Sequence, residues 1–248
     1  MNRINPVILV MLAFVALQGC GVNHPSADEI ISKAIERHGG GLYEQADIDF
    51  KFRGKTFKTK LVDGQYQIER MFSEQENAIM DVLKEDKTIA RWINNQEISL
   101  DGSSRENIYN NTNSVVYFAL LPYRLNDPAV NKQLMCTSDI NGEPYYKVEI
   151  TFDDPGGGKD FEDSFIYWIH KDSFTVDYLA YSYNINGGGV RFRKAYNQRE
   201  VNGIRFQDYV NYTIDQDFPA HELDYAFQSG MLRELSRVDL EEVQVKIK

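Results

Sequence analysis

The sequence has few of the residues that form catalytic and metal-binding sites. It contains two cysteines and four histidines among 248 residues. Two isolated cysteines exclude CxxC redox and zinc motifs, and we expect Cys136 to be a small buried residue at a strand end. The segment 221–225 (HELDY) begins like the zinc-protease motif HExxH but has tyrosine in place of the second histidine. We therefore expect no enzymatic activity, no cofactor and no metal.

Positive charge is also scarce. The chain has 27 Lys and Arg against 37 Asp and Glu, a formal net charge of −10. Because a nucleic-acid binder needs a basic face, this balance argues against that class. Beyond the N-terminus no apolar run approaches the ~20 residues of a membrane span, and neither a repeat nor a Pro/Ser-rich linker divides the chain. With 15 Tyr and 14 Phe available for a core, one domain over residues 26–248 is expected.

One acidic cluster allows a second interpretation. Five carboxylates surround the glycines at 156–158: Asp153, Asp154, Asp160, Glu162 and Asp163. Such oxygen ligands could hold Ca²⁺, but their spacing does not match an EF-hand loop. Because charged residues at loop tips are usually solvated, we expect the fold not to need Ca²⁺.

The N-terminus carries the most specific signal. Arg3 precedes an apolar run of 12 residues, 6–17, which suits the apolar region of a signal peptide and is too short to span a bilayer. The following Leu17-Gln18-Gly19-Cys20 resembles a bacterial lipobox. We expect residues 1–19 to be a lipoprotein signal peptide, Cys20 to carry lipid chains such as palmitate, and residues 20–25 to be a short tether. The alternative is an ordinary secretory signal with an incidental cysteine.

A helix and a series of strands are predicted next. Ser26 and Glu29 form a capping box, and an apolar stripe follows at Ile30, Ile31, Ala34 and Ile35 before the glycines at 39–41. From residue 46 the apolar period becomes two. Turn residues separate strands expected near 46–52, 57–61, 66–70, 78–84, 88–93, 97–100, 132–138, 145–152, 164–170, 174–183, 190–198, 204–214 and 238–247.

Three stretches do not fit the alternating pattern. Residues 101–113 are polar and rich in turn formers, and residues 217–230 look irregular. The apolar run 114–121 fits either a strand or a buried helix, and breakers at Pro122 and Pro128 follow it. We favour a short buried helix there, which could act as a plug or a lid.

Aromatic residues occupy both faces of one predicted strand. Tyr167 alternates with Trp168 within an apolar run, and Tyr178 and Tyr181 follow on the next strand. This pattern indicates a sheet that is covered on both sides, or one that curves around an apolar interior able to hold a lipid-like ligand.

These features together resemble a known family. The lipobox, the capped helix at 27–38, the strand meander with its apolar insertion and the hairpin at 165–183 are similar to the LolA/LolB-like family of lipoprotein carriers and receptors, and to uncharacterised lipoproteins of Bacteroidota. The resemblance implies a mainly β fold with a few helices: an unclosed antiparallel β-barrel, or half-barrel, with an N-terminal helix and a mid-chain helical plug or lid. In that family the concave side receives acyl chains.

The expected function follows from this resemblance and from the anchor. We expect a lipoprotein of the bacterial cell envelope, anchored in the outer membrane because Gly21 is not the aspartate that retains such proteins in the inner membrane. Its ligand would be a lipid or acyl chain, with contacts predicted at Phe118, Tyr167, Trp168 and Tyr178. The alternative is a structural lipoprotein that contacts protein or glycan and fills its concavity with its own side chains.

Overall fold

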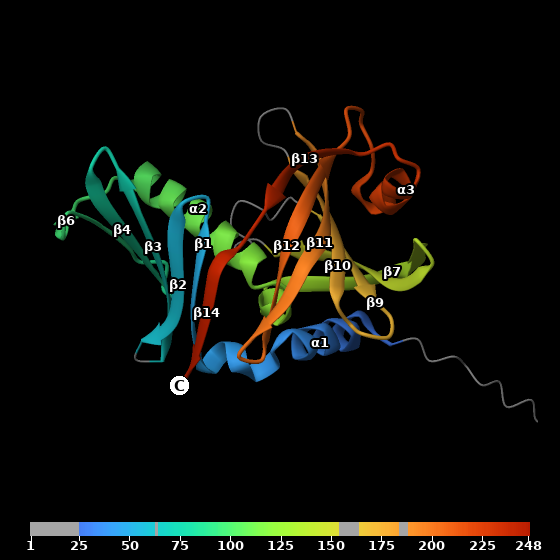
Figure 1. The fold of residues 1–248 in the computed structure, drawn as a ribbon, viewed down its shortest axis with the longest axis horizontal. Helices are drawn as coiled ribbons and strands as arrows, with labels where there is room; N and C mark the ends of the chain where they lie inside the picture. Colours follow the sequence, from blue (N-terminus) through green and yellow to red (C-terminus); the bar gives the residue numbers. More distant parts are fainter. Residues whose placement is uncertain (1–24, 63, 154–163, 184–187) are drawn as a thin grey trace, which may run out of the picture.

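Two antiparallel sheets of seven strands each form most of the molecule in the computed structural model (Figure 1). The structure describes residues 25–62, 64–153, 164–183 and 188–248. In spatial order the first sheet contains β14 (Glu241–Ile247), β1 (Ala46–Phe52), β2 (Lys55–Val62), β3 (Gln65–Glu74), β4 (Asn77–Lys84), β5 (Ile89–Ile93) and β6 (Gln96–Ile98). The second contains β13 (Arg233–Val238), β12 (Ile204–Thr213), β11 (Gly189–Val201), β10 (Val176–Tyr183), β9 (Phe165–His170), β8 (Glu143–Phe152) and β7 (Val130–Ile140).

Most neighbouring strands are consecutive in the chain, so each sheet is largely a meander. The exception is β14, which pairs with β1 in the first sheet, although it directly follows β13 of the second sheet in the chain. The chain therefore passes from the second sheet to the first at Asp239 and Leu240 (Figure 1). The two sheets do not close into a barrel, and the predicted unclosed half-barrel is confirmed.

Helix α1 (Ala27–His38) forms as the sequence predicts. Ser26 Oγ accepts a hydrogen bond from the Glu29 backbone N–H, and the Glu29 carboxylate accepts one from the Ser26 N–H. Because the apolar residues recur at helical spacing, one face of α1 is buried. Ile30, Ile31 and Ala34 pack in the same core as Tyr167 and Leu179. We call this face of the sheets, which also meets α2, the concave side.

Helix α2 (Gly102–Ala119) is much longer than predicted. The Asp101 carboxylate accepts a hydrogen bond from the Ser104 N–H at 2.6 Å and so caps the helix start. Ile108, Thr112 and Val116, spaced by four residues, form its buried stripe. The expected turn-rich segment 101–113 is therefore helical, and the helix predicted over 114–121 is wrong in extent. In Figure 1, α2 extends from the first sheet towards the second.

Helix α3 (Leu223–Gln228) covers the face of the second sheet that points away from α1. Leu223 and Ala226 pack there against Trp168 and Phe192. Asp224 anchors the helix, because its carboxylate accepts hydrogen bonds from Trp168 Nε1 at 3.1 Å and from Lys147 Nζ at 3.1 Å. The second sheet is thus covered on both sides, which explains why β9 is apolar on both faces. The segment 217–230, which we expected to be irregular, contains α3.

Two further expectations are wrong. The final strand predicted at 238–247 is divided into β13 and β14, because the chain changes sheets between them. Cys136 is exposed instead of buried. It lies within β7, the edge strand of the second sheet, where the register with β8 shifts between Leu134 and Cys136, and a bulged edge position leaves its side chain in solvent.

Candidate functional site

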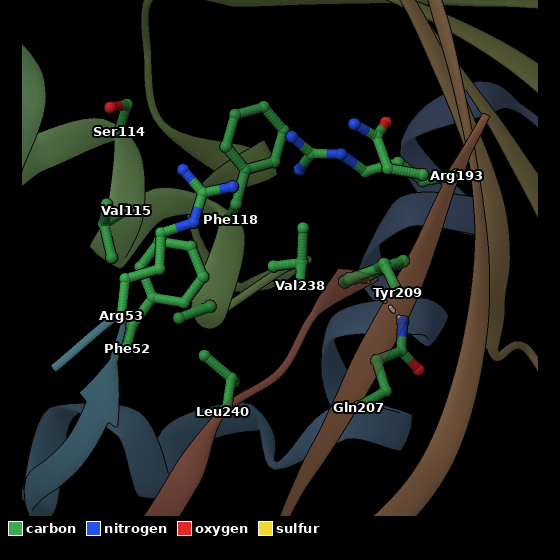
Figure 2. Close-up of a pocket in the computed structure, with 12 residues that line it drawn as sticks. Phe52, Arg53, Ser114, Val115, Phe118, Arg193, Gln207, Tyr209, Val238 and Leu240 are labelled. Carbon is green, nitrogen blue, oxygen red and sulfur yellow. Dashed lines mark hydrogen bonds between the residues drawn. The ribbon is translucent and has the colours of Figure 1, made fainter. Parts of the chain in front are cut away.

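The C-terminal half of α2 leaves a cavity between itself and the seam of the two sheets. We call this space of about 200 Å³ the α2 cavity. Its walls come from α2, from the end of β1, from β11 and β12, and from the chain that links β13 to β14 (Figure 2). The lining residues are Phe52, Arg53, Ser114, Val115, Phe118, Ala119, Arg193, Gln207, Tyr209, Asn211, Val238 and Leu240.

A second cavity lies on the other side of the same helix. This far cavity has a volume of about 150 Å³, and its wall includes Tyr117, Phe152 and Phe165. Ser114 and Phe118 line both cavities. The helix therefore fills the concave side incompletely, and the Phe118 ring lies on the boundary between the two spaces.

Phe118 packs among aromatic rings of the second sheet. Its ring centroid lies 5.9 Å from that of Tyr181 and 6.2 Å from that of Phe165. Such tilted ring pairs add about 0.5–1.5 kcal/mol each to the energy of burial. These contacts hold the end of α2 against the sheet.

Arg193 brings a buried positive charge to the α2 cavity. Its side chain extends from β11 towards Phe118 (Figure 2), and the guanidinium carbon lies 4.3 Å from the Phe118 ring centroid. Nη2 donates a hydrogen bond to the Tyr181 hydroxyl at 3.1 Å, whereas Nε has no partner. Arg193 is 9% exposed and forms no salt bridge with a described carboxylate. Because a buried cation is costly without a partner, its contacts with two aromatic rings are only partial compensation.

Three polar groups on β12 complete the wall. Gln207 Nε2 donates hydrogen bonds to the Val176 carbonyl and to the Tyr209 hydroxyl, both at 2.7 Å. Burial raises the pKa of Tyr209 to about 12, so its phenol stays protonated. Gln207 Oε1 and Asn211 Oδ1 are buried without a hydrogen-bond partner. The cavity wall thus combines apolar side chains with a buried cation, and two residues of this wall carry buried acceptors without partners.

The structure separates the four residues predicted to contact a ligand. Phe118 lines both cavities. Tyr167 is on the concave side but is fully buried in the core below α2 and lines neither cavity. Trp168 and Tyr178 lie on the opposite face, in the core beneath α3. We therefore retain only Phe118 in the candidate site.

Sequence reasoning missed most of the wall. Arg193, Gln207 and Leu240 are far from Phe118 in the sequence, and no local spacing marks them as its neighbours. The charge of Arg193 gave no signal either, because β11 also carries Arg191, Lys194 and Arg199.

Other predicted sites fall partly outside the described residues. Cys20, the signal peptide at 1–19 and the tether up to residue 24 lie there, as do Asp154, Asp160, Glu162 and Asp163. Among the residues that are described, no helix is long and apolar enough to cross a membrane, and no group of three His, Cys, Asp or Glu side chains is arranged to hold a metal ion.

The chain is similar in fold to solved bacterial structures. A LolA superfamily protein from Nitrosomonas europaea is 15% identical, with a TM-score of 0.48, covering 91% of this chain and 94% of that chain. A DUF1329 family protein from Desulfovibrio piger is 13% identical, with a TM-score of 0.47, covering 89% and 93%. No curated protein matches the sequence. The sequence matches the family of unknown function DUF6503 over residues 7–239, nearly its whole length, and the chain belongs to that family.

Proposed function

We propose that this protein binds the apolar chain of a lipid or fatty acid on its concave side, next to α2. The observation that carries the proposal is the pair of cavities on either side of α2, which share Phe118 as a wall. Each is smaller than the roughly 300–1,000 Å³ of ordinary ligand pockets. An acyl chain would therefore enter as the Phe118 ring moves aside and the two cavities join, with the end of α2 acting as a lid.

The experiment is a titration of the purified soluble domain with a fluorescent fatty-acid analogue. We expect micromolar affinity, about −8 kcal/mol. Phe118→Asp should weaken binding by at least tenfold, because the new charge would be desolvated beside the ligand. The new carboxylate would lie near the Arg193 guanidinium, which helps the variant to fold. Phe118→Trp changes the same wall without adding a charge. Its larger ring should narrow both cavities and so weaken binding.

Tyr225→Asp provides the matched control. Tyr225 is an aromatic residue of a helix, but it is 63% exposed on α3 and lines neither cavity. This variant should bind the analogue as the wild type does. A domain that gives no titratable response to any acyl ligand would contradict the proposal. If the domain does bind the analogue, native mass spectrometry of protein purified from its own membrane would identify the chain that is carried.

A second candidate function has one observation in its favour. Phe118 already packs on Phe165 and Tyr181, so part of the concave side is filled by the protein itself. This filling fits a non-enzymatic scaffold that contacts protein or glycan in the cell envelope. Two results would support the scaffold function: cavities that do not widen, and a Phe118→Trp variant that gives the same titration result as the wild type.

The proposal includes a lipid anchor in the outer membrane. Leu17, Gly19 and Cys20 support it, because they match the lipobox pattern, and two or three acyl chains give stable anchoring where one gives only marginal binding. Cys20→Ala should release the protein from the membrane fraction, as measured by immunoblotting after a carbonate wash. A variant that stays in the membrane pellet would show that another element anchors the protein.

A further inference from the structure

A cleft with an excess of positive charge lies beside the α2 cavity on the concave side of the first sheet. We call it the basic cleft. Its volume is about 590 Å³. The lining residues are Phe52, Arg53, Lys55, Phe57, Arg70, Phe72, Ser73, Glu74, Arg91, Asn111 and Val115. The last two belong to α2, so the helix overhangs the cleft as it overhangs the cavity.

Strand register places three of the charged residues in one row. Arg70 on β3 pairs with Asp81 on β4, and Asp81 pairs with Arg91 on β5. Because directly paired residues point to the same face of a sheet, the two guanidinium groups flank one carboxylate. Asp81 Oδ2 accepts from Arg70 Nη2 at 2.6 Å, and Oδ1 accepts from Arg91 Nε at 2.6 Å. The Asp81 side chain is fully buried.

This triad explains Asp81 but not the charge of the cleft. One carboxylate neutralises only one of the two arginines. Arg53 and Lys55 add two further cations, and neither forms a salt bridge with a described residue. Lys55 Nζ instead lies 4.5 Å from the Phe72 ring centroid. With Glu74 as the remaining acid of the wall, four cations face two carboxylates in a chain of net charge −10. Such local excess is typical of a site for an anion.

The cleft and the α2 cavity adjoin each other. Phe52, Arg53 and Val115 line both. In Figure 2 the Arg53 side chain lies over Phe52, with the guanidinium group towards Phe118. Its guanidinium carbon is 5.0 Å from the Phe52 ring centroid. Arg53 is thus positioned where an apolar chain in the cavity would end and a head group in the cleft would begin.

We propose that the ligand is an anionic amphiphile, whose phosphate or carboxylate head group lies in the basic cleft while its apolar chain lies in the α2 cavity. This inference rests on the proposed function and adds the charge of the ligand. Charge-assisted hydrogen bonds from Arg and Lys to such oxygens are about twice as strong as neutral ones. Both the cleft and the cavity are on the concave side, so the opposite faces of the two sheets take no part in binding this ligand.

The experiment compares dodecyl phosphate with dodecanol by calorimetry, below the micelle concentration, on the soluble domain. The chains are identical, so the ratio of the two affinities reports the head group alone. We expect a preference of at least about tenfold for the phosphate. The preference should shrink between about 0.05 and about 0.5 M NaCl, because salt screens partly exposed charges. Inorganic phosphate alone should compete weakly.

Two variants locate the head group. Arg53→Gln combined with Lys55→Gln should reduce the preference to nearly one. Both side chains are partly or fully exposed, so the fold does not depend on their charge. The matched control is Lys58→Gln, which removes one cation from β2 on the other face of the strand, where Lys58 pairs with Asp49. It should keep the full preference.

Several outcomes would overturn the inference. Equal affinity for dodecyl phosphate and dodecanol would refute it and leave the proposed function intact. Binding of neither would reject both. Inorganic phosphate that binds as tightly as dodecyl phosphate would show a free-phosphate site. A preference lost in Arg193→Gln but kept in the double variant would place the head group deep in the α2 cavity instead of in the cleft.

Discussion

His38, the last residue of α1, is completely buried beneath the second sheet. Its Nε2 accepts a hydrogen bond from the Val176 backbone N–H at 3.3 Å, which requires an unprotonated nitrogen. Burial, aided by the nearby positive charges of Arg205 and Arg37, lowers the pKa of His38 to about 3. The imidazole is therefore neutral in the folded protein at neutral and mildly acidic pH.

This buried histidine predicts acid sensitivity. In the unfolded chain its pKa is about 6.5, so between about pH 6.5 and 3 the unfolded state binds more protons than the folded state. Stability must then fall as the pH decreases through this window, by at most about 1.4 kcal/mol per pH unit from His38. Urea denaturation at pH 7, 6 and 5 measures the slope.

His38→Gln isolates this contribution. The amide oxygen can still accept from Val176, but the side chain no longer titrates. The variant should lose less stability than the wild type between pH 7 and 5. His221→Gln is the control, because His221 is half-exposed next to Glu222. This variant should show the same change of unfolding free energy with pH as the wild type. Parallel slopes for the wild type and His38→Gln would disprove the assignment.

At the scale of elements, the sequence predicts structure best where one local signal suffices. The capping box at Ser26 and Glu29 fixes the start of α1, and turn residues mark most hairpins. Only the C-terminal part of α2 is predicted, because just three of its 18 residues are buried. Its polar first half resembles a loop, and the cap at Asp101 is its main local sign. The chain changes sheets between β13 and β14 because the whole fold curves. The alternation of apolar and polar residues along a strand does not predict where such a change occurs.

The candidate site is less predictable for the same reason. An apolar run ending in breakers predicts that Phe118 belongs to a buried helix, and Phe118 lies on α2, where it is partly buried. Alternation on β9 shows that Tyr167 and Trp168 face opposite ways, but it does not say which face is concave. Arg53 and Arg193 meet the same cavity from different sheets, and only the complete half-barrel brings them together.

At the scale of the molecule, the two sheets depend on a short link between β13 and β14. The Leu240 backbone belongs to neither ladder. Its N–H donates to Asp208 Oδ1 at 2.9 Å, and its carbonyl accepts from Arg199 Nη2 at 2.6 Å. Asp208 is 3% exposed and also accepts from Asn197 Nδ2 at 2.6 Å. Side chains of β11 and β12 thus satisfy the backbone where the chain changes sheets.

Removing this carboxylate should loosen the link. Asp208→Ala leaves the Leu240 N–H and the Arg199 guanidinium without their buried partner, which should lower the free energy of unfolding by about 3 kcal/mol. Because this link fixes the start of β14 against the second sheet, with a hydrogen bond from Asn202 Nδ2 to the Val245 carbonyl at 2.7 Å further along the strand, amide exchange should rise in 241–247 more than in β3 and β4. Hydrogen-exchange mass spectrometry measures both regions in one experiment.

Asp215→Ala is the appropriate comparison for this link. Asp215 pairs with Arg233, but their side chains are 75% and 56% exposed, and such surface pairs contribute little to stability. This variant should leave exchange in 241–247 unchanged. Leu240 also lines the α2 cavity, so Asp208→Ala should weaken binding of the fatty-acid analogue although Asp208 does not line the cavity. If Asp208→Ala raises exchange equally in both sheets, the link does not act as the joint between them, and the carboxylate stabilises the fold only generally.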